Sequence, residues 1–208
     1  MTGLSQITEL IPAVGRINDD ALREALCRTW AEAFRRGPFE SFVDVPQGLA
    51  VPTRSLLTHV NDVNRLALSF IDVVHRDYGL QVDAEVALAG AILHDVDKAF
   101  ILTRLDTGAV AYVDGWESDD HGRLGAELAM ECGVPEEIAD LVRFHNPFSY
   151  EGHLPGTVEG TIVHYADLAA ADFGAIQHGA EPIHARTLIV KKEQRFLEML
   201  APKHRTPR

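Results

Sequence analysis

The stretch Leu93-His94-Asp95-Val96-Asp97-Lys98 follows a dense run of Ala, Val, Leu and Ile residues that starts at Ala84. This run, with Asp83 as its N-cap, predicts a helix buried on nearly all sides, with His94 and Asp95 on its C-terminal part. Neighbours on a helix point about 100° apart, so both side chains reach one site only if that site lies against the helix. A carboxylate in such a place can bridge two metal ions while the imidazole binds one of them.

Further histidines and one aspartate surround this pair in the sequence. The chain has ten histidines, and histidine is the commonest metal ligand among side chains. A single histidine in a helix is more often a core residue with a satisfied hydrogen bond. An ordered set from separate helices indicates a metal site instead, because rigid helices bring distant ligands together. The set consists of His59, His94, Asp95, His121, His145 and Asp167.

The periodicity of apolar residues predicts an all-α protein, a bundle of six to seven helices with at most one short hairpin. The hairpin is expected within 102–118, where Tyr112 and Trp116 could line a lid. We divide the chain into an N-terminal helix and connecting loop at 1–52, a metal-binding core at 53–176, and a C-terminal helix and tail at 177–208. The predicted helices cover about 21–36, 53–78, 84–95, 118–132, 135–145, 157–173 and 183–200.

Composition narrows the class of protein. The net charge of −12 disfavours nucleic acid as a partner, because phosphate backbones require a basic surface. No apolar stretch is long enough for a membrane span, and the N-terminus lacks the features of a secretory signal, so we expect a cytoplasmic protein. The cysteines, Cys27 and Cys132, are expected to be free thiols. The oligomeric state cannot be inferred from the sequence.

Several segments, in order along the chain, resemble the HD-domain superfamily of metal-dependent phosphohydrolases, which includes a di-iron oxygenase branch. The string from Leu93 to Lys98 resembles the family's His-Asp dyad with its following lysine. The segments 120–129 and 133–145 resemble the helices of the third and fourth histidine, and Tyr165-Ala166-Asp167 resembles the closing aspartate. The resemblance covers about 56–173.

This resemblance implies a ligand set and a pair of ions. His59, His94, Asp95 and Asp167 would hold one divalent ion, and Asp95 would bridge to a second ion held by His121 and His145. The nitrogen and oxygen donors favour iron or manganese. Asp95 and Lys98 are the expected catalytic residues, with Lys98 facing the substrate.

Several positions depart from particular branches of the superfamily. Lys98 stands where some single-metal nucleotide hydrolases have a glutamate, and no Gly-Tyr-Pro signature of cyclic-dinucleotide phosphodiesterases follows His145. Asp97 stands where glycine is common, and we expect an ion pair with Lys98 or Arg104. His164 is a possible partner or substitute for the ligands near Asp167. Candidate anion clamps are Arg104, Arg123 and Arg143.

The leading functional hypothesis is hydrolysis of a small phosphate ester or phosphodiester. Two ions about 3.5 to 4 Å apart would lower the pKa of a bridging water and stabilise phosphoryl charge. The alternative is a mixed-valent di-iron oxygenase that acts on a small polar substrate with the same ligands. A third hypothesis, a non-catalytic ligand-binding module, is disfavoured by the complete ligand set. In each case the expected partner is a small anionic or polar molecule.

Overall fold

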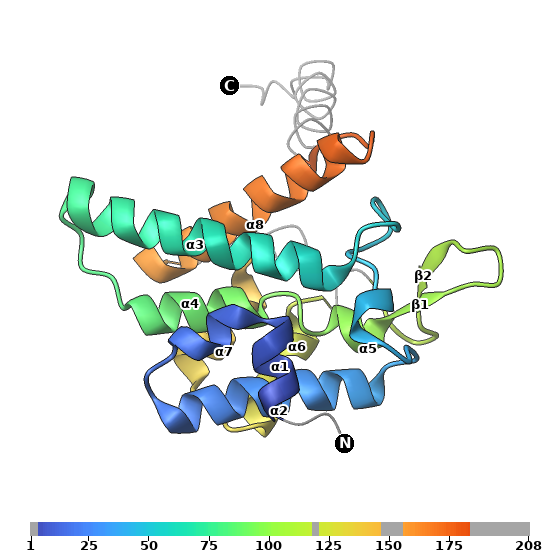
Figure 1. The fold of residues 1–208 in the computed structure, drawn as a ribbon, viewed down its shortest axis with the longest axis horizontal. Helices are drawn as coiled ribbons and strands as arrows, with labels where there is room; N and C mark the ends of the chain where they lie inside the picture. Colours follow the sequence, from blue (N-terminus) through green and yellow to red (C-terminus); the bar gives the residue numbers. More distant parts are fainter. Residues whose placement is uncertain (1–3, 118–120, 147–155, 184–208) are drawn as a thin grey trace, which may run out of the picture.

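The computed structural model describes residues 4–117, 121–146 and 156–183, which form a helical bundle with a two-stranded hairpin at one end (Figure 1). The predicted all-α class is therefore confirmed. The hairpin pairs β1 (Leu102–Arg104) with β2 (Val110–Tyr112) in antiparallel register, with Leu102 opposite Tyr112. Among the described helices, none has the length and apolar character that would let it cross a membrane.

The helices begin where the sequence supplies caps. The side chains of Asp19, Ser55, Asp83 and Thr157 accept hydrogen bonds from backbone N–H groups in the first turns that follow them. The elements are α1 (Leu4–Leu10), η1 (Pro12–Arg16), α2 (Asp20–Arg36), η2 (Phe42–Asp44), α3 (Leu56–Tyr78), α4 (Ala84–Leu93), α5 (Lys98–Ile101), α6 (Arg123–Glu131), α7 (Glu136–Phe144) and α8 (Val158–Gln177).

The central helix is α4, which packs against α3, α7 and α8 and also contacts α2 (Figure 1). Its residues from Ala87 to Leu93 are all buried, as the apolar run predicts. The approach of its neighbours is closest at Gly90. A Cβ atom built there would lie 2.8 Å from Leu141 Cδ1 of α7 and 3.3 Å from Val163 Cγ2 of α8. A glycine at this position lets the three helices converge.

Two of the expected helix boundaries are wrong in ways that matter for the site. His94 and Asp95 lie just after α4, in a turn whose N–H groups bond three residues back, as Val96 N does to Leu93 O. His121 precedes α6 because Gly122 has a φ of +83°, which interrupts a right-handed helix.

The remaining differences are smaller. Helix α3 begins at Leu56 after its Ser55 cap, α8 extends to Gln177, and α1, η1 and α5 were not expected. The cap expected at Ser118 and most of the helix expected at 183–200 lie outside the described residues. The division of the chain at 52 and 176 stays a prediction.

Candidate metal centre

The residues expected to bind metal come together in the structure. Their nitrogen and oxygen atoms form two groups, and within each group these atoms lie within 4.8 Å of one another. Asp95 belongs to both groups, as expected for a carboxylate that bridges two ions. The first group is His59, His94, Asp95 and Asp167, and the second is Asp95, His121 and His145.

The first group lies between α3, the turn after α4, and α8. His59 Nε2 is 3.0 Å from Asp167 Oδ1 and 3.2 Å from Asp95 Oδ2. His94 Nε2 is 3.2 Å from His59 Nε2. Ligand atoms that share one ion at about 2.1 Å are themselves roughly 3 Å apart, so this spacing fits a common ion.

The second group contains buried polar atoms without a hydrogen-bond partner. His121 Nε2 is 3.1 Å and His145 Nε2 is 3.6 Å from Asp95 Oδ1, but neither contact has hydrogen-bond geometry. Asp95 Oδ1 and His145 Nε2 are therefore buried and unpaired. An unpaired buried polar atom costs about 1 to 3 kcal/mol, and a cation between these atoms would remove that cost. The donor set fits a second ion.

Helix C-termini orient two of the imidazoles. His94 Nδ1 lies 2.7 Å from the Ala91 carbonyl oxygen, and His145 Nδ1 lies 2.6 Å from that of Val142. Carbonyls in the last turn of a helix have no intrahelical donor, so each can accept the Nδ1 proton. This fixes the tautomer whose Nε2 lone pair points into the cluster.

His121 is held by a side chain instead of a backbone carbonyl. Its Nδ1 is 2.9 Å from Asp97 Oδ1, and the Gly122 N–H donates to Asp97 Oδ2 at 2.6 Å. The expectation that Asp97 pairs with Lys98 or Arg104 is wrong. The turn after α4 directs its fully buried carboxylate toward the start of α6 instead.

Arg54, which the sequence analysis did not identify, lies behind His59. Its buried guanidinium donates to Gln47 Oε1 at 2.9 Å and pairs with Asp62. The Arg54 Nη1 atom is also 3.3 Å from His59 Nδ1. On α8, Gly174 leaves room for it, because a Cβ there would lie 2.6 Å from the Arg54 Nη1 atom. An arginine before a helix is usually exposed, so no sequence signal marks this one.

Burial disfavours the charged form of every group in the cluster, so the direction of each pKa shift depends on the charges that lie beside the group. Burial raises the pKa of Asp95, but Lys98 and His94 pull this pKa well below its ordinary value. Burial lowers the pKa of His121, yet the carboxylates of Asp97 and Asp95 raise it to about 9. The pKa of His145 is lowered, because burial outweighs the opposing effect of the nearby Asp95 carboxylate.

Lys98 lies where the ligand cluster meets a pocket. Its Nζ donates to Asp95 Oδ2 at 2.6 Å, and although burial lowers its pKa, the carboxylates of Asp95, Asp167 and Asp97 together raise it above its ordinary value, so it stays protonated. The pocket has a volume of about 430 Å³ and opens onto His59, His121 and Asp167. Its walls include residues 47–51, Ile101, Leu102 and Tyr112. Tyr112 was expected to line a lid, whereas residues 47–51 belong to a segment that was predicted only as a connecting loop.

The three expected anion clamps are engaged elsewhere. Arg104 donates to the Gly108 and Pro52 carbonyls, Arg123 pairs with Glu127, and Arg143 pairs with Asp140. Within the described part of the chain, none of them lines the pocket at the ligands.

His164 contacts the site indirectly. Its Nδ1 is 2.8 Å from the His145 carbonyl oxygen, which joins α8 to the end of α7. In the structure it therefore supports a ligand and is not itself part of either ligand group.

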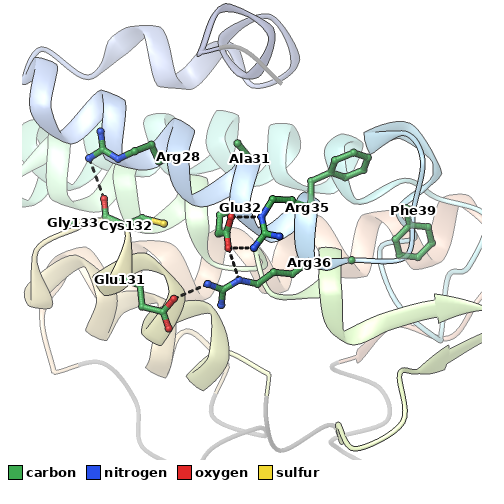
Figure 2. A pocket seen from close by; sticks show the side chains of 11 residues that line it. Arg28, Ala31, Glu32, Arg35, Arg36, Phe39, Glu131, Cys132 and Gly133 are labelled. Carbon is green, nitrogen blue, oxygen red and sulfur yellow. Dashed lines mark hydrogen bonds and ion pairs between the residues drawn. The ribbon is translucent and has the colours of Figure 1, made fainter. Parts of the chain in front are cut away.

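A larger hollow of about 1110 Å³ lies between α2 and the end of α6 (Figure 2). Arg35 and Arg36 bond to Glu32, and Arg36 also bonds to Glu131 at 2.7 Å. The positive charges there are neutralised by neighbouring carboxylates, and none of the proposed ligands lines this hollow. The pocket beside Lys98 is therefore the candidate functional site.

Comparison with known proteins identifies the family. The model of the HD domain matches residues 56–172, which include all six proposed ligands. The chain belongs to the HD domain family. The resemblance expected from the sequence is confirmed.

One curated relative of this HD-domain chain is an archaeal enzyme. Over 114 residues the chain is 32% identical to the dihydroneopterin 2',3'-cyclic phosphate phosphodiesterase of Methanocaldococcus jannaschii. The matched region covers 55% of this chain and 45% of the relative, so the chain spans less than half of that protein. No solved structure matches the chain.

Proposed function

We propose that this HD-domain protein is a metal-dependent phosphohydrolase that cleaves a small phosphodiester, with a cyclic phosphate as the leading candidate. The observation that carries the proposal is the pair of ligand groups that share Asp95 and leave Asp95 Oδ1 and His145 Nε2 without partners. The printed activity of the archaeal relative supports the phosphodiester class.

The residues of the two groups would hold two divalent ions, and their nitrogen and oxygen donors favour iron or manganese. Such ions supply a lowered pKa for water and a stabilising charge for phosphoryl oxygens. The chain supplies the geometry. Asp95 stays ionised because its pKa is depressed, and the hydrogen bonds of His94 and His145 keep their Nε2 atoms directed into the cluster.

The pocket residues would bind the substrate. Lys98 carries a positive charge at the boundary between the ligands and the pocket, where it can neutralise a phosphate that reaches the cluster. The apolar walls at Ile101, Leu102 and Val51 would exclude water from the rest of the ester. In the reaction one water is consumed, one P–O ester bond breaks, and the product is a phosphomonoester with a free hydroxyl.

The test uses protein loaded anaerobically with Mn²⁺. We expect turnover of a nucleoside 2',3'-cyclic phosphate or of bis(p-nitrophenyl) phosphate, with one oxygen from ¹⁸O-labelled water in the product phosphate. The Asp95→Asn variant should be inactive, and the exposed-surface control Asp72→Asn should be fully active.

Two other results would overturn the proposal. Substrate-dependent O₂ uptake by the iron-loaded protein, with no hydrolysis of any phosphate ester, would establish the oxygenase alternative. Tight binding of phosphate esters without turnover under any metal would establish a binding module.

A further inference from the structure

Asp97 is a buried charge that the proposed chemistry does not use directly. It lies in the turn after α4, two residues beyond the shared ligand Asp95, and its exposed fraction is 0%. Val96 and Gly125 surround it, and a Cβ at Gly125 would approach the Asp97 carboxyl carbon to 3.5 Å. A buried carboxylate is costly unless its oxygens are hydrogen-bonded, so its partners indicate its purpose.

Both oxygens of Asp97 accept hydrogen bonds from the segment that carries His121. Oδ2 accepts from the Gly122 N–H at 2.6 Å, and Oδ1 lies 2.9 Å from His121 Nδ1. A carboxylate can only accept, so the His121 Nδ1 atom must carry the proton in this contact. The other ring nitrogen, Nε2, then faces Asp95 Oδ1 at 3.1 Å.

The remaining histidine of the second group shows why a side chain is needed here. His145 ends a helix and finds its Nδ1 acceptor in the carbonyl of Val142, three residues earlier. His121 stands before α6, next to a glycine with a φ of +83°, and its Nδ1 atom meets the side chain of Asp97 instead of a helix carbonyl. Asp97 provides the acceptor that the backbone provides for His145.

We propose that Asp97 is a positioning residue that holds His121 in the Nδ1-protonated form and thereby makes Nε2 a ligand of the second ion. This inference rests on the proposed metal centre and adds a residue outside the ligand set. A carboxylate that does not itself bind the metal, but orients an imidazole that does, typically contributes about 10- to 100-fold to metal affinity.

The Asp97→Asn variant tests the role with almost no change in shape. An asparagine has one oxygen for two donors, so its amide NH₂ must face either the Gly122 N–H or His121 Nδ1. We expect the affinity for a second Mn²⁺ or Zn²⁺ ion to fall about 10- to 100-fold. The affinity for the first ion should change by less than about threefold, because the first group does not include His121.

Two further variants serve as controls. Asp83→Asn also removes a carboxylate that accepts two backbone N–H bonds, but at the start of α4, and it should leave both affinities unchanged. His121→Ala should reproduce the loss of the second ion. If Asp97→Asn binds two ions with wild-type affinities, the role of Asp97 is refuted and the metal centre stands. If the wild-type protein itself binds a single ion, the proposed second group fails.

A spectroscopic measurement on the wild type separates positioning from mere folding, and it holds even if the Asp97 variant does not fold. In long-range ¹H–¹⁵N spectra of the Zn²⁺-loaded protein, the resonances absent from His121→Ala identify the His121 ring. We expect a proton on Nδ1 and a metal-shifted Nε2. A His121 ring without a proton on Nδ1 would overturn the proposal.

Discussion

The two ends of the ligand cluster place opposite charges behind their outer histidines. At one end the carboxylate of Asp97 faces His121 Nδ1 at 2.9 Å, and at the other the guanidinium of Arg54 faces His59 Nδ1 at 3.3 Å. A carboxylate favours an Nδ1–H group and strengthens the imidazole as a ligand, whereas a guanidinium disfavours both. The His59 end has the additional carboxylate of Asp167. We infer that metal binding at the His59 end depends on the number of ligands, whereas metal binding at the His121 end depends on how its histidine is oriented.

The largest effect should come from Asp95, which belongs to both ends. Asp95→Asn removes the shared charge, and we expect the affinity for each ion to fall roughly a thousandfold, equivalent to about 4 kcal/mol for a ligand. Isothermal titration with Mn²⁺ measures it. Loss of only one ion would show that Asp95 is not shared and would break the comparison.

The pH dependence should distinguish the ends next. Burial lowers the pKa of His121, but Asp97 and Asp95 raise it to about 9, so an ion must displace a proton there below that pH. The apparent affinity for the second ion should rise about tenfold per pH unit between about pH 7 and 9. In Asp97→Asn this rise should level off at a lower pH. An unchanged pH profile in the variant would contradict the assignment.

His121 should also make the stability of the metal-free protein depend on pH, in the direction opposite to that of the metal affinity. A histidine whose folded pKa lies above its unfolded value stabilises the fold fully at low pH, and this stabilisation is lost as the pH rises through the folded value. The metal-free protein should therefore lose stability between about pH 7 and 9, and urea unfolding with a chelator present measures the change. His121→Ala should show a smaller decline over this range.

Lys98 contacts the oxygen of Asp95 that faces the His59 end. Lys98→Ala should leave two ions bound while turnover falls tenfold or more, as expected when a group that neutralises the substrate is removed. Metal content and steady-state kinetics together measure this. The control is Arg104→Ala, because within the described residues the Arg104 side chain donates to the backbone oxygens of Gly108 and Pro52 and does not line the pocket. An equal loss of turnover in Lys98→Ala and Arg104→Ala would show that Lys98 has no specific role at the site.

The smallest effect is expected at Arg54. Arg54→Met removes a positive charge from behind His59, so the affinity for the first ion should rise severalfold, while the free energy of unfolding falls by about 2 kcal/mol. Arg65→Met is a matched control, because Arg65 also pairs with Asp62 but is exposed. A tenfold loss of first-ion affinity in Arg54→Met would show that both ends are held in the same way.

The clustering of the proposed ligands was predictable, because their residue types and their order on successive helices can be recognised in the sequence. Histidines and aspartates on successive helices indicate a centre even when a boundary is misplaced, as at His94 and His121. The partners behind the ligands were not predictable. Asp97 reaches His121 through a turn of three-residue hydrogen bonds and a left-handed glycine, and such geometry has no periodic signature. Arg54 depends on space that a glycine on a distant helix leaves open.

The close approach at Gly90 has a consequence for the metal the centre prefers. His94, His145 and Asp167 each follow four residues after Gly90, Leu141 and Val163, so three of the proposed ligands come shortly after the point where the helices approach most closely. The absence of a side chain at Gly90 therefore helps to set the distances between these proposed ligands. An alanine at position 90 would wedge the helices apart by tenths of an ångström, a change comparable to the differences in radius between divalent ions. We expect such a shift to change which divalent ions the proposed centre binds, although Gly90 itself belongs to neither ligand group.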